Sequence, residues 1–216
     1  MGYKGRITGI AFVAIILFTI RTVVKSHFGA APHPIPLPAI IPIIIGWYLG
    51  KEYDKSVYRA NRDSLTGLFN RRYVFEKIHK TILKTKKRNN TLAIILLDIN
   101  NFKQINDSFG HETGDLILKS ISKLLANSFT SKDIVSRWGG DEFLIISSFA
   151  DQNDLNQKIA HFENALKNQD WEYQSLSVSI GKAISSSGAD EFESLISKAD
   201  ANMYEVKTKC QAHTQF

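Results

Sequence analysis

Two glycines followed by two acids, Gly139-Gly140-Asp141-Glu142, constrain the fold of this chain more than any other short stretch. Apolar residues stand on both sides, at 134–135 and 143–146, so the pattern predicts a tight β-hairpin with carboxylates at its tip. We expect the glycines to supply positive φ and to let a backbone or a phosphate approach closely. Carboxylates on such a turn suit a hard cation such as Mg²⁺, although many acidic hairpin ends are simply solvated.

The basic excess of the chain is confined to its first quarter. The 216 residues carry a net charge of +6, and residues 1–62 hold 8 Lys/Arg against 2 Asp/Glu. Residues 63–216 hold 19 of each sign. A neutral domain lacks the basic surface of a nucleic-acid binder, so we expect no nucleic-acid partner. The one cysteine, Cys210, excludes an intrachain disulfide framework.

Residues 1–50 are expected to form a membrane anchor with two spanning segments, 7–24 and 33–50. The first holds one charged residue, Arg21, and the second holds no Asp, Glu, Lys or Arg. A spanning helix needs about 20 apolar residues and tolerates about 17, so both segments are long enough if Arg21 reaches the surface. A cleaved signal peptide remains an alternative for the first segment, and an interfacial or re-entrant course for the Pro-rich second one.

Basic residues at the outer ends of the two segments predict the topology. Lys4 and Arg6 precede the first segment, whereas only Arg21 and Lys25 separate the two. The positive-inside rule then favours a multi-pass hairpin in the inner (cytoplasmic) membrane, with both ends in the cytoplasm. The second segment is followed by a polar linker, residues 51–62, which carries Lys51, Lys55, Arg59 and Arg62.

From residue 63 onward, apolar spacing predicts alternating helices and strands. The expected fold class is an α/β sandwich with a central sheet flanked by helices, in which the acidic turn faces the end of a buried strand at 92–97. A second strand is expected at 176–183, and helices are expected at 71–87, 111–129, 154–167 and 192–207.

Asp98 directly follows the buried strand and is a candidate metal ligand. Taken alone, it could equally cap the helix that starts near Asn101. Beside the acids at 141–142 the metal interpretation is favoured, because two Mg²⁺ ions held by carboxylates commonly drive displacement at phosphorus.

Polar residues between 101 and 115 favour nucleotide binding. Backbone N–H groups at the helix start near Asn101 can cradle phosphates, and Lys103 adds a positive charge. Asp115 is suited to accept hydrogen bonds from N1–H and the amino group of guanine, which adenine does not offer together. Simpler roles remain open, namely a neutral structural His111 and a helix cap at Asp115.

Four ordered sequence blocks in residues 63–207 resemble the GGDEF domain of the diguanylate cyclase family. The first is Asp-Ser-Leu-Thr-Gly-Leu-Phe-Asn-Arg-Arg at 63–72, and the third is the Gly-Gly-Asp-Glu-Phe signature at 139–143. The second, 98–115, holds Phe-Lys, Asn-Asp, Phe-Gly-His and Gly-Asp, and the fourth, 177–207, holds Ser-Val-Ser-Ile-Gly and Ala-Asp-Ala-Asn-Met-Tyr. Residues 1–62 lie outside the resemblance.

The resemblance implies a palm-like nucleotidyl cyclase fold and a homodimer in which each protomer binds one GTP. The 3′-OH of each GTP attacks the α-phosphorus of the other, which gives cyclic di-GMP and two pyrophosphates. Two Mg²⁺ ions per site are implied, with Mn²⁺ as an alternative. By position, the metal would be held by Asp98, the carbonyl of Ile99, Asp141 and Glu142.

The resemblance also implies roles for the remaining site residues. Asp141 would act as general base and Lys103 would stabilise the transition state. The substrate-binding residues would be Phe102, Asn106, His111, Asp115 and Lys207.

Three positions depart from the family pattern. Many members carry Arg-x-x-Asp before the signature as a product-inhibition site; here Thr130 replaces the arginine and Asp133 is retained. A threonine hydroxyl cannot replace bidentate capture by arginine, so we expect weak or absent product inhibition. Gln211 replaces a frequent phosphate-binding arginine, which we expect to weaken GTP binding by about 1–3 kcal/mol. Asn100 replaces an acid outside the metal site, and activity should survive.

The leading hypothesis is a membrane-anchored diguanylate cyclase of bacterial signal transduction. The alternative is a catalytically silent GTP-binding module that acts through interactions. The intact site residues favour the enzyme. Input would arrive through the membrane segments, the linker, or an unidentified membrane or regulatory partner.

Overall fold

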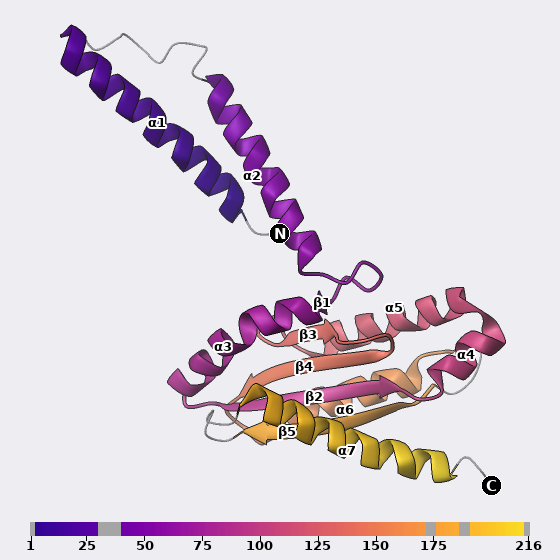
Figure 1. Ribbon diagram of the computed structural model, residues 1–216. Coiled ribbons are helices and arrows are strands. Elements are labelled where there is room, and N and C mark those ends of the chain that lie inside the picture. The colour runs from indigo at the N-terminus through magenta and orange to yellow at the C-terminus, as the bar shows by residue number, and fades with distance from the viewer. Residues whose placement is uncertain (1–2, 30–39, 172–175, 186–190, 214–216) are drawn as a thin grey trace. The chain divides into compact units, whose positions relative to one another are not determined.

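The computed structural model describes residues 3–29, 40–171, 176–185 and 191–213 (Figure 1). The chain divides into two compact units, Met1–Asn61 and Arg62–Phe216.

The first unit is a helical hairpin of α1 (Lys4–Phe28) and α2 (Ile40–Ala60), which lie side by side in Figure 1. Within the described residues, α1 alone is long and apolar enough to cross a membrane, and its most apolar stretch is not buried. Of the expected second span, residues 33–39 lie outside the described part of the chain and residues 40–50 begin α2. Residues 51–60, which we expected to be a linker, continue α2 without a break.

Paired glycines set the distance between the two helices. A Cβ atom added at Gly5 would lie 2.5 Å from the carbonyl oxygen of Gly50, and one added at Gly9 would collide with that of Gly46. Both helices therefore present glycines four residues apart, an arrangement that lets helix backbones approach closely. Any larger side chain at these positions would force α1 and α2 apart.

Asp54 of α2 caps the first turn of α1. Its carboxylate accepts hydrogen bonds from the backbone N–H groups of Gly5 at 2.8 Å and Arg6 at 3.4 Å. The Arg6 guanidinium lies 3.6 Å away, and the Asp54 side chain is only 6% exposed. The residue that precedes α1, Tyr3, makes no side-chain cap, so Asp54 provides the acceptor and the negative charge that a helix N-terminus favours.

The second unit is built on a five-stranded mixed sheet with the order β1-β3-β4-β2-β5. The β1–β3 pair is parallel, and the other neighbouring strands are antiparallel. The strands are β1 (Phe69–Asn70), β2 (Thr91–Ile99), β3 (Ile134–Arg137), β4 (Glu142–Phe149) and β5 (Val178–Ser185).

Alternate residues of β2 point to opposite faces of the sheet and create two cores. Leu92, Ile94 and Leu96 pack with α3 (Arg71–Lys87) and α7 (Phe192–His213) on one face. Ala93, Ile95 and Leu97 pack with α5 (His111–Ser128) and α6 (Gln152–Asn168) on the other. The short helix α4 (Phe102–Phe109) follows β2 and packs on α5. This central sheet with helices on both faces confirms the predicted α/β fold class.

The expected elements agree with the structure to within a few residues. The helix expected at 71–87 is α3, and the strand expected at 92–97 forms the middle of β2. The last helix extends beyond the predicted residue 207 to His213. The two-residue strand β1 was not predicted, because so short a segment has no measurable periodicity.

Candidate active site

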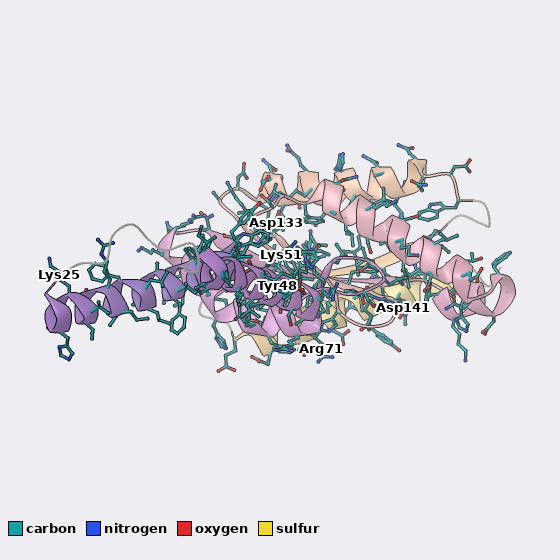
Figure 2. All side chains as sticks on the ribbon, turned by 90° about the horizontal axis from the view of Figure 1, so that it is seen from above. Lys25, Tyr48, Lys51, Arg71, Asp133 and Asp141 are labelled. Atoms are coloured by element: carbon teal, nitrogen blue, oxygen red, sulfur yellow. The ribbon has the colours of Figure 1, made fainter. Side chains whose placement is uncertain are left out.

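The pairing of β2 with β4 brings the candidate acids together at one end of the sheet. Asp98 lies opposite Glu142 in the antiparallel register, and the N–H of Ile99 donates to the carbonyl oxygen of Asp141 at 3.4 Å. Asp98 is buried, whereas Asp141 and Glu142 are half-buried. The structure therefore gathers all four sequence-predicted metal-binding residues around the acidic turn, which Figure 2 marks at Asp141.

Lys207 joins this group from α7. Its Nζ lies 2.7 Å from Oδ1 of Asp98, and the two side chains are 31% and 8% exposed, respectively. The two residues are far apart in the sequence, and they meet because α7 packs against β2 and β5. Lys207 thus provides positive charge at the expected metal position.

The acids of the turn have an unfavourable electrostatic environment when no cation is present. Burial raises the pKa of Asp141 above its ordinary value, and the neighbouring Asp98 carboxylate raises it further. Burial likewise raises the pKa of Glu142, with Asp98 and Asp141 as further causes. Crowded, desolvated carboxylates of this kind would be stabilised by a bound cation.

The donor set suits a divalent metal that also binds phosphate oxygens. Within the described residues, no three His, Cys, Asp or Glu side chains converge to enclose a metal by themselves. Mg²⁺ does not require such an enclosure, because it is usually held by one or two carboxylates together with water and substrate phosphates. Asp98, Asp141 and the Ile99 carbonyl fit this open type of site, and Glu142 adds charge beside it.

The signature turn differs from the sequence prediction in its backbone. Among the described glycines, only Gly29, Gly67 and Gly110 have positive φ, so the prediction for Gly139 and Gly140 was wrong. The hairpin closes instead through the N–H groups of Trp138 and Gly139, which both donate to the Glu142 carbonyl, at 2.8 and 3.3 Å. This closure needs no left-handed residue.

The space around the turn explains Gly139 and leaves Gly140 without a steric reason. A Cβ atom at Gly139 would lie 2.7 Å from the carboxylate of Glu142, whereas one at Gly140 would meet no described atom within 4 Å. Gly139 therefore makes room for the Glu142 side chain, and Gly140 leaves the tip of the turn open.

Arg137 fixes the turn to the start of the domain, a role that the sequence analysis missed. Its guanidinium donates to the Gly140 carbonyl at 2.7 Å and to both carboxylate oxygens of Asp63 at 3.2 and 3.3 Å. Asp63 also accepts from the N–H and hydroxyl of Thr66. The charges of Arg137 and Asp63 were visible in the sequence, but nothing in their spacing indicated that they would meet.

The predicted nucleotide-binding residues lie on α4 and α5. Lys103, His111 and Asp115 are exposed, and Asn106 lies against Gly114, where an added Cβ would collide with its amide oxygen. That oxygen is buried and has no hydrogen-bond partner in the described part of the chain. Phe102 is half-buried against the core below. Lys103, His111 and Asp115 are therefore accessible to a polar ligand, whereas the Asn106 oxygen faces Gly114.

The predicted product-inhibition position is closed by internal contacts. One carboxylate oxygen of Asp133 accepts from the N–H and the hydroxyl of Thr130, both at 2.8 Å. Lys158 Nζ lies 3.3 Å from this same oxygen, and the other oxygen accepts from the Ser147 hydroxyl at 2.7 Å. Asp133 is buried, and both of its carboxylate oxygens already have donors from this chain.

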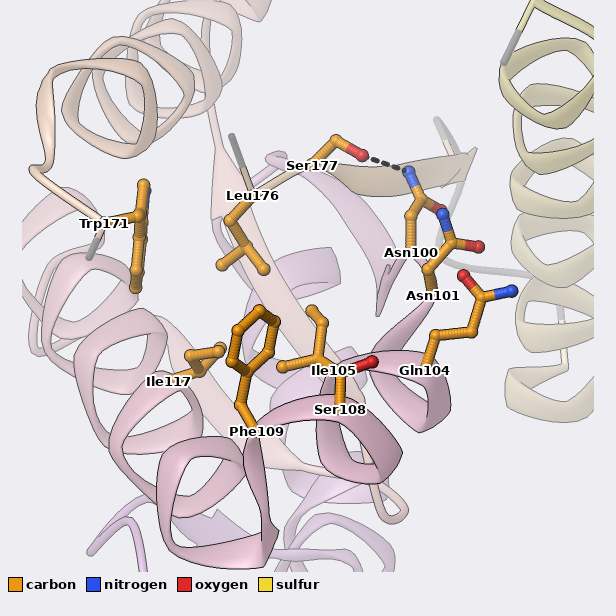
Figure 3. Close-up of a pocket in the computed structure, with 10 residues that line it drawn as sticks. All are labelled: Asn100, Asn101, Gln104, Ile105, Ser108, Phe109, Ile117, Trp171, Leu176 and Ser177. Atoms are coloured by element: carbon orange, nitrogen blue, oxygen red, sulfur yellow. Dashed lines mark hydrogen bonds between the residues drawn. The ribbon is translucent and has the colours of Figure 1, made fainter. Parts of the chain in front are cut away.

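A pocket of about 310 Å³ lies on the opposite face of α4 from Lys103 and Asn106 (Figure 3). None of its lining side chains is ionisable, which makes it unsuitable for a triphosphate. It is lined by Asn100, Asn101, Gln104, Ile105, Ser108, Phe109, Ile117, Trp171, Leu176 and Ser177. The side chain of Gln211 lies outside the described part of the structure.

The mixed sheet, its helical layers and the acidic hairpin beside Asp98 define a domain of the palm-like nucleotidyl cyclase class. Residues 60–213 match the family model described as "Diguanylate cyclase, GGDEF domain", and the chain belongs to this GGDEF family.

Curated relatives agree with the family assignment. Diguanylate cyclase DosC of Escherichia coli (strain K12) is 33% identical over 159 residues, which cover 71% of this chain and 34% of DosC. Response regulator PleD of Caulobacter vibrioides (strain NA1000 / CB15N) is 31% identical over 166 residues, which cover 74% of this chain and 37% of PleD. The chain therefore spans about a third of the length of these relatives.

Solved structures show the same fold. The coiled coil and GGDEF domain of DgcB from Caulobacter crescentus, in complex with c-di-GMP, superposes with a TM-score of 0.69 at 22% identity, covering 75% of this chain and 88% of that one. The GGDEF domain of PA1120 (TpbB or YfiN) from Pseudomonas aeruginosa superposes with a TM-score of 0.62 at 29% identity, covering 68% and 89%.

Proposed function

We propose that this protein is a diguanylate cyclase that condenses two GTP molecules into cyclic di-GMP and two pyrophosphates. The observation that carries the proposal is the arrangement of Asp98, Asp141 and Glu142 around the signature turn, with Lys207 beside them. Phosphoryl-type transfer requires mainly positioning and charge neutralisation, which carboxylate-held cations and lysines supply.

Two Mg²⁺ ions per site, or Mn²⁺ in their place, would be held by Asp98, the Ile99 carbonyl, Asp141 and Glu142. Bound metal would neutralise charge on the reacting phosphate and promote ionisation of the attacking hydroxyl. Asp141, at the tip of the hairpin, would accept the proton of the 3′-OH.

The remaining residues would bind and orient GTP. Asp115 and Asn106 would read guanine, with His111 and Phe102 beside the base; the exposure of Asp115 and His111 on α5 supports this. Lys103 would stabilise charge on the transferring phosphate, and Lys207 would reach the terminal phosphates. Each protomer holds one GTP in this scheme, so turnover needs a homodimer.

We also propose that the first unit anchors the protein in the inner membrane as a two-span hairpin. The antiparallel arrangement supports this, because Lys25 lies toward one end of the hairpin and Lys51 toward the other (Figure 2). The more basic end, with Lys4, Arg6 and Lys51, would face the cytoplasm and keep the GGDEF domain near GTP. A membrane or regulatory partner would supply the input.

Product analysis of the full chain with GTP and Mg²⁺ tests the proposal, alongside Asp141→Ala. We expect cyclic di-GMP from the wild type and at least a hundredfold less from the variant, the size of effect seen when one charge-stabilising group is removed from an active site. A folded, dimeric wild-type protein that binds GTP but yields no cyclic di-GMP would instead identify the silent binding module.

A further inference from the structure

Lys207 makes a contact that the proposed catalytic role does not explain. In the structure its ammonium group donates a 2.7 Å hydrogen bond to Asp98, the most buried acid of the site. A lysine whose only task was to hold terminal phosphates would have no reason to occupy a metal-binding carboxylate.

Geometry places Lys207 and a metal in competition. Asp98 is 8% exposed, so its carboxylate has little room for a second cation while the ammonium remains in contact. The charges of the site favour one cation at this position in the same way. Asp98, Asp141 and Glu142 crowd one end of the sheet and are stabilised by a positive charge nearby. The ammonium supplies this charge when no metal is bound.

The Lys207 side chain is also able to move away from Asp98. It lies one turn beyond the buried Met203 on the side of α7 that faces the sheet, but its side chain is still 31% exposed and has a flexible four-carbon stem. An ammonium group forms hydrogen bonds without the fixed geometry of a guanidinium, so it can exchange a carboxylate for a phosphate oxygen with little rearrangement.

We propose that Lys207 is a stand-in cation that occupies Asp98 in the empty enzyme and is transferred to the phosphates when nucleotide arrives, which frees Asp98 for the metal. Lys207 therefore weakens metal binding to the nucleotide-free protein and couples metal binding to nucleotide binding. This inference rests on the proposed function, because it assigns a metal and a triphosphate to the same site.

Titration of the full chain in detergent with Mn²⁺ alone, followed by calorimetry, tests the inference. We expect Lys207→Met to bind Mn²⁺ on the order of tenfold more tightly than the wild type, the effect of removing one competing charge-assisted hydrogen bond. Lys207→Arg keeps the charge and should remain near the wild type. Lys198→Met, which removes an exposed lysine from the same helix, should leave Mn²⁺ binding unchanged.

A second pair of variants ties the effect to Asp98. In an Asp98→Asn background, Lys207→Met should no longer strengthen Mn²⁺ binding, because the shared carboxylate is gone. Equal or weaker Mn²⁺ binding by Lys207→Met in the wild-type background would overturn the inference.

The two proposals fail separately. Cyclic di-GMP production without the Lys207→Met effect overturns the stand-in role alone. The Lys207→Met effect in a protein that makes no cyclic di-GMP supports the stand-in role and overturns the cyclase.

Discussion

The helical hairpin buries Asp54, the GGDEF domain buries Asp98 beside the signature turn, and these two aspartates are stabilised in different ways. Asp54 accepts hydrogen bonds from two backbone N–H groups and has Arg6 nearby, all on α1. Within the described residues, the carboxylate of Asp98 is paired with a side chain, Lys207. Backbone donors at a helix start cannot leave without unfolding that helix, whereas a lysine side chain can move away. We infer from this comparison that Asp54 holds two helices together, whereas Asp98 can be released to bind a ligand.

The largest effect on stability is expected for Asp54→Ala. This change leaves the first N–H groups of α1 without their acceptor and the partly buried Arg6 guanidinium without its nearby negative charge, which should cost about 3 kcal/mol of unfolding free energy. Denaturant unfolding of the full chain in detergent, followed by helical circular dichroism, measures it. Glu52→Ala on the same helix is the control, because Glu52 is largely exposed and its loss should leave the unfolding midpoint unchanged. Equal effects of the two changes would show that Asp54 is not a helix cap.

Gly9→Leu tests whether close helix contact supports the Asp54 cap. The new side chain would collide with the Gly46 carbonyl, and the separation of α1 from α2 should cost about 1–3 kcal/mol. The same unfolding measurement applies, with Ala14→Leu on an exposed part of α1 as the control. A Gly9→Leu protein as stable as Ala14→Leu would mean that the glycine contact contributes nothing.

A third aspartate, Asp63, should make the stability of the protein depend on pH. Burial tends to raise its pKa, but the hydrogen bonds from Thr66 and the Arg137 charge outweigh this, so the net pKa is lowered. A lowered pKa means that Asp63 contributes stability above its ordinary pKa and loses it as the pH falls through the folded-state value. The stability difference between wild type and Asp63→Asn, measured by unfolding from pH 7 down to pH 3, should therefore shrink toward acid. A difference independent of pH would contradict the Asp63–Arg137 tie.

The smallest effect is expected for Thr130→Arg. Restoring the arginine of the family motif should not restore product inhibition, because Asp133 remains buried and bonded to Ser147 and Lys158. Initial rates of cyclic di-GMP formation with and without added product measure this, and Thr130→Arg combined with Lys158→Ala provides the matched comparison. Strong inhibition of the single variant by cyclic di-GMP would show that Asp133 is more accessible than its contacts indicate.

Local sequence patterns were sufficient to predict most of the fold. The helix at 71–87 and the strand around 92–97 follow from apolar spacing, because helical and extended periodicity depend only on near neighbours. The position of Asp98 at a strand end was predicted for the same reason, whereas its place beside the acidic turn was expected from the α/β fold class. Glycine conformation in the turn was not, because spacing alone does not specify which hydrogen bonds close a hairpin.

Long-range polar contacts could not be predicted from the sequence. Asp98 and Lys207 are 109 positions apart, and Gly5 and Asp54 are 49 apart. Such pairs form only once the packing of whole elements is fixed, so no periodic pattern in the sequence predicts them. The continuation of α2 through residues 51–60 was missed for a related reason, since its polar surface resembled that of a linker.

Cyclic di-GMP formation from GTP by Asp98→Asn and Asp54→Asn, each compared with the wild-type full chain, tests the central claim most directly. Both changes remove one buried negative charge and keep the side-chain size. Our account predicts product from the wild type and from Asp54→Asn, and none from a folded Asp98→Asn that still binds GTP. Wild-type rates from Asp98→Asn would contradict the assignment of Asp98 to the reacting site.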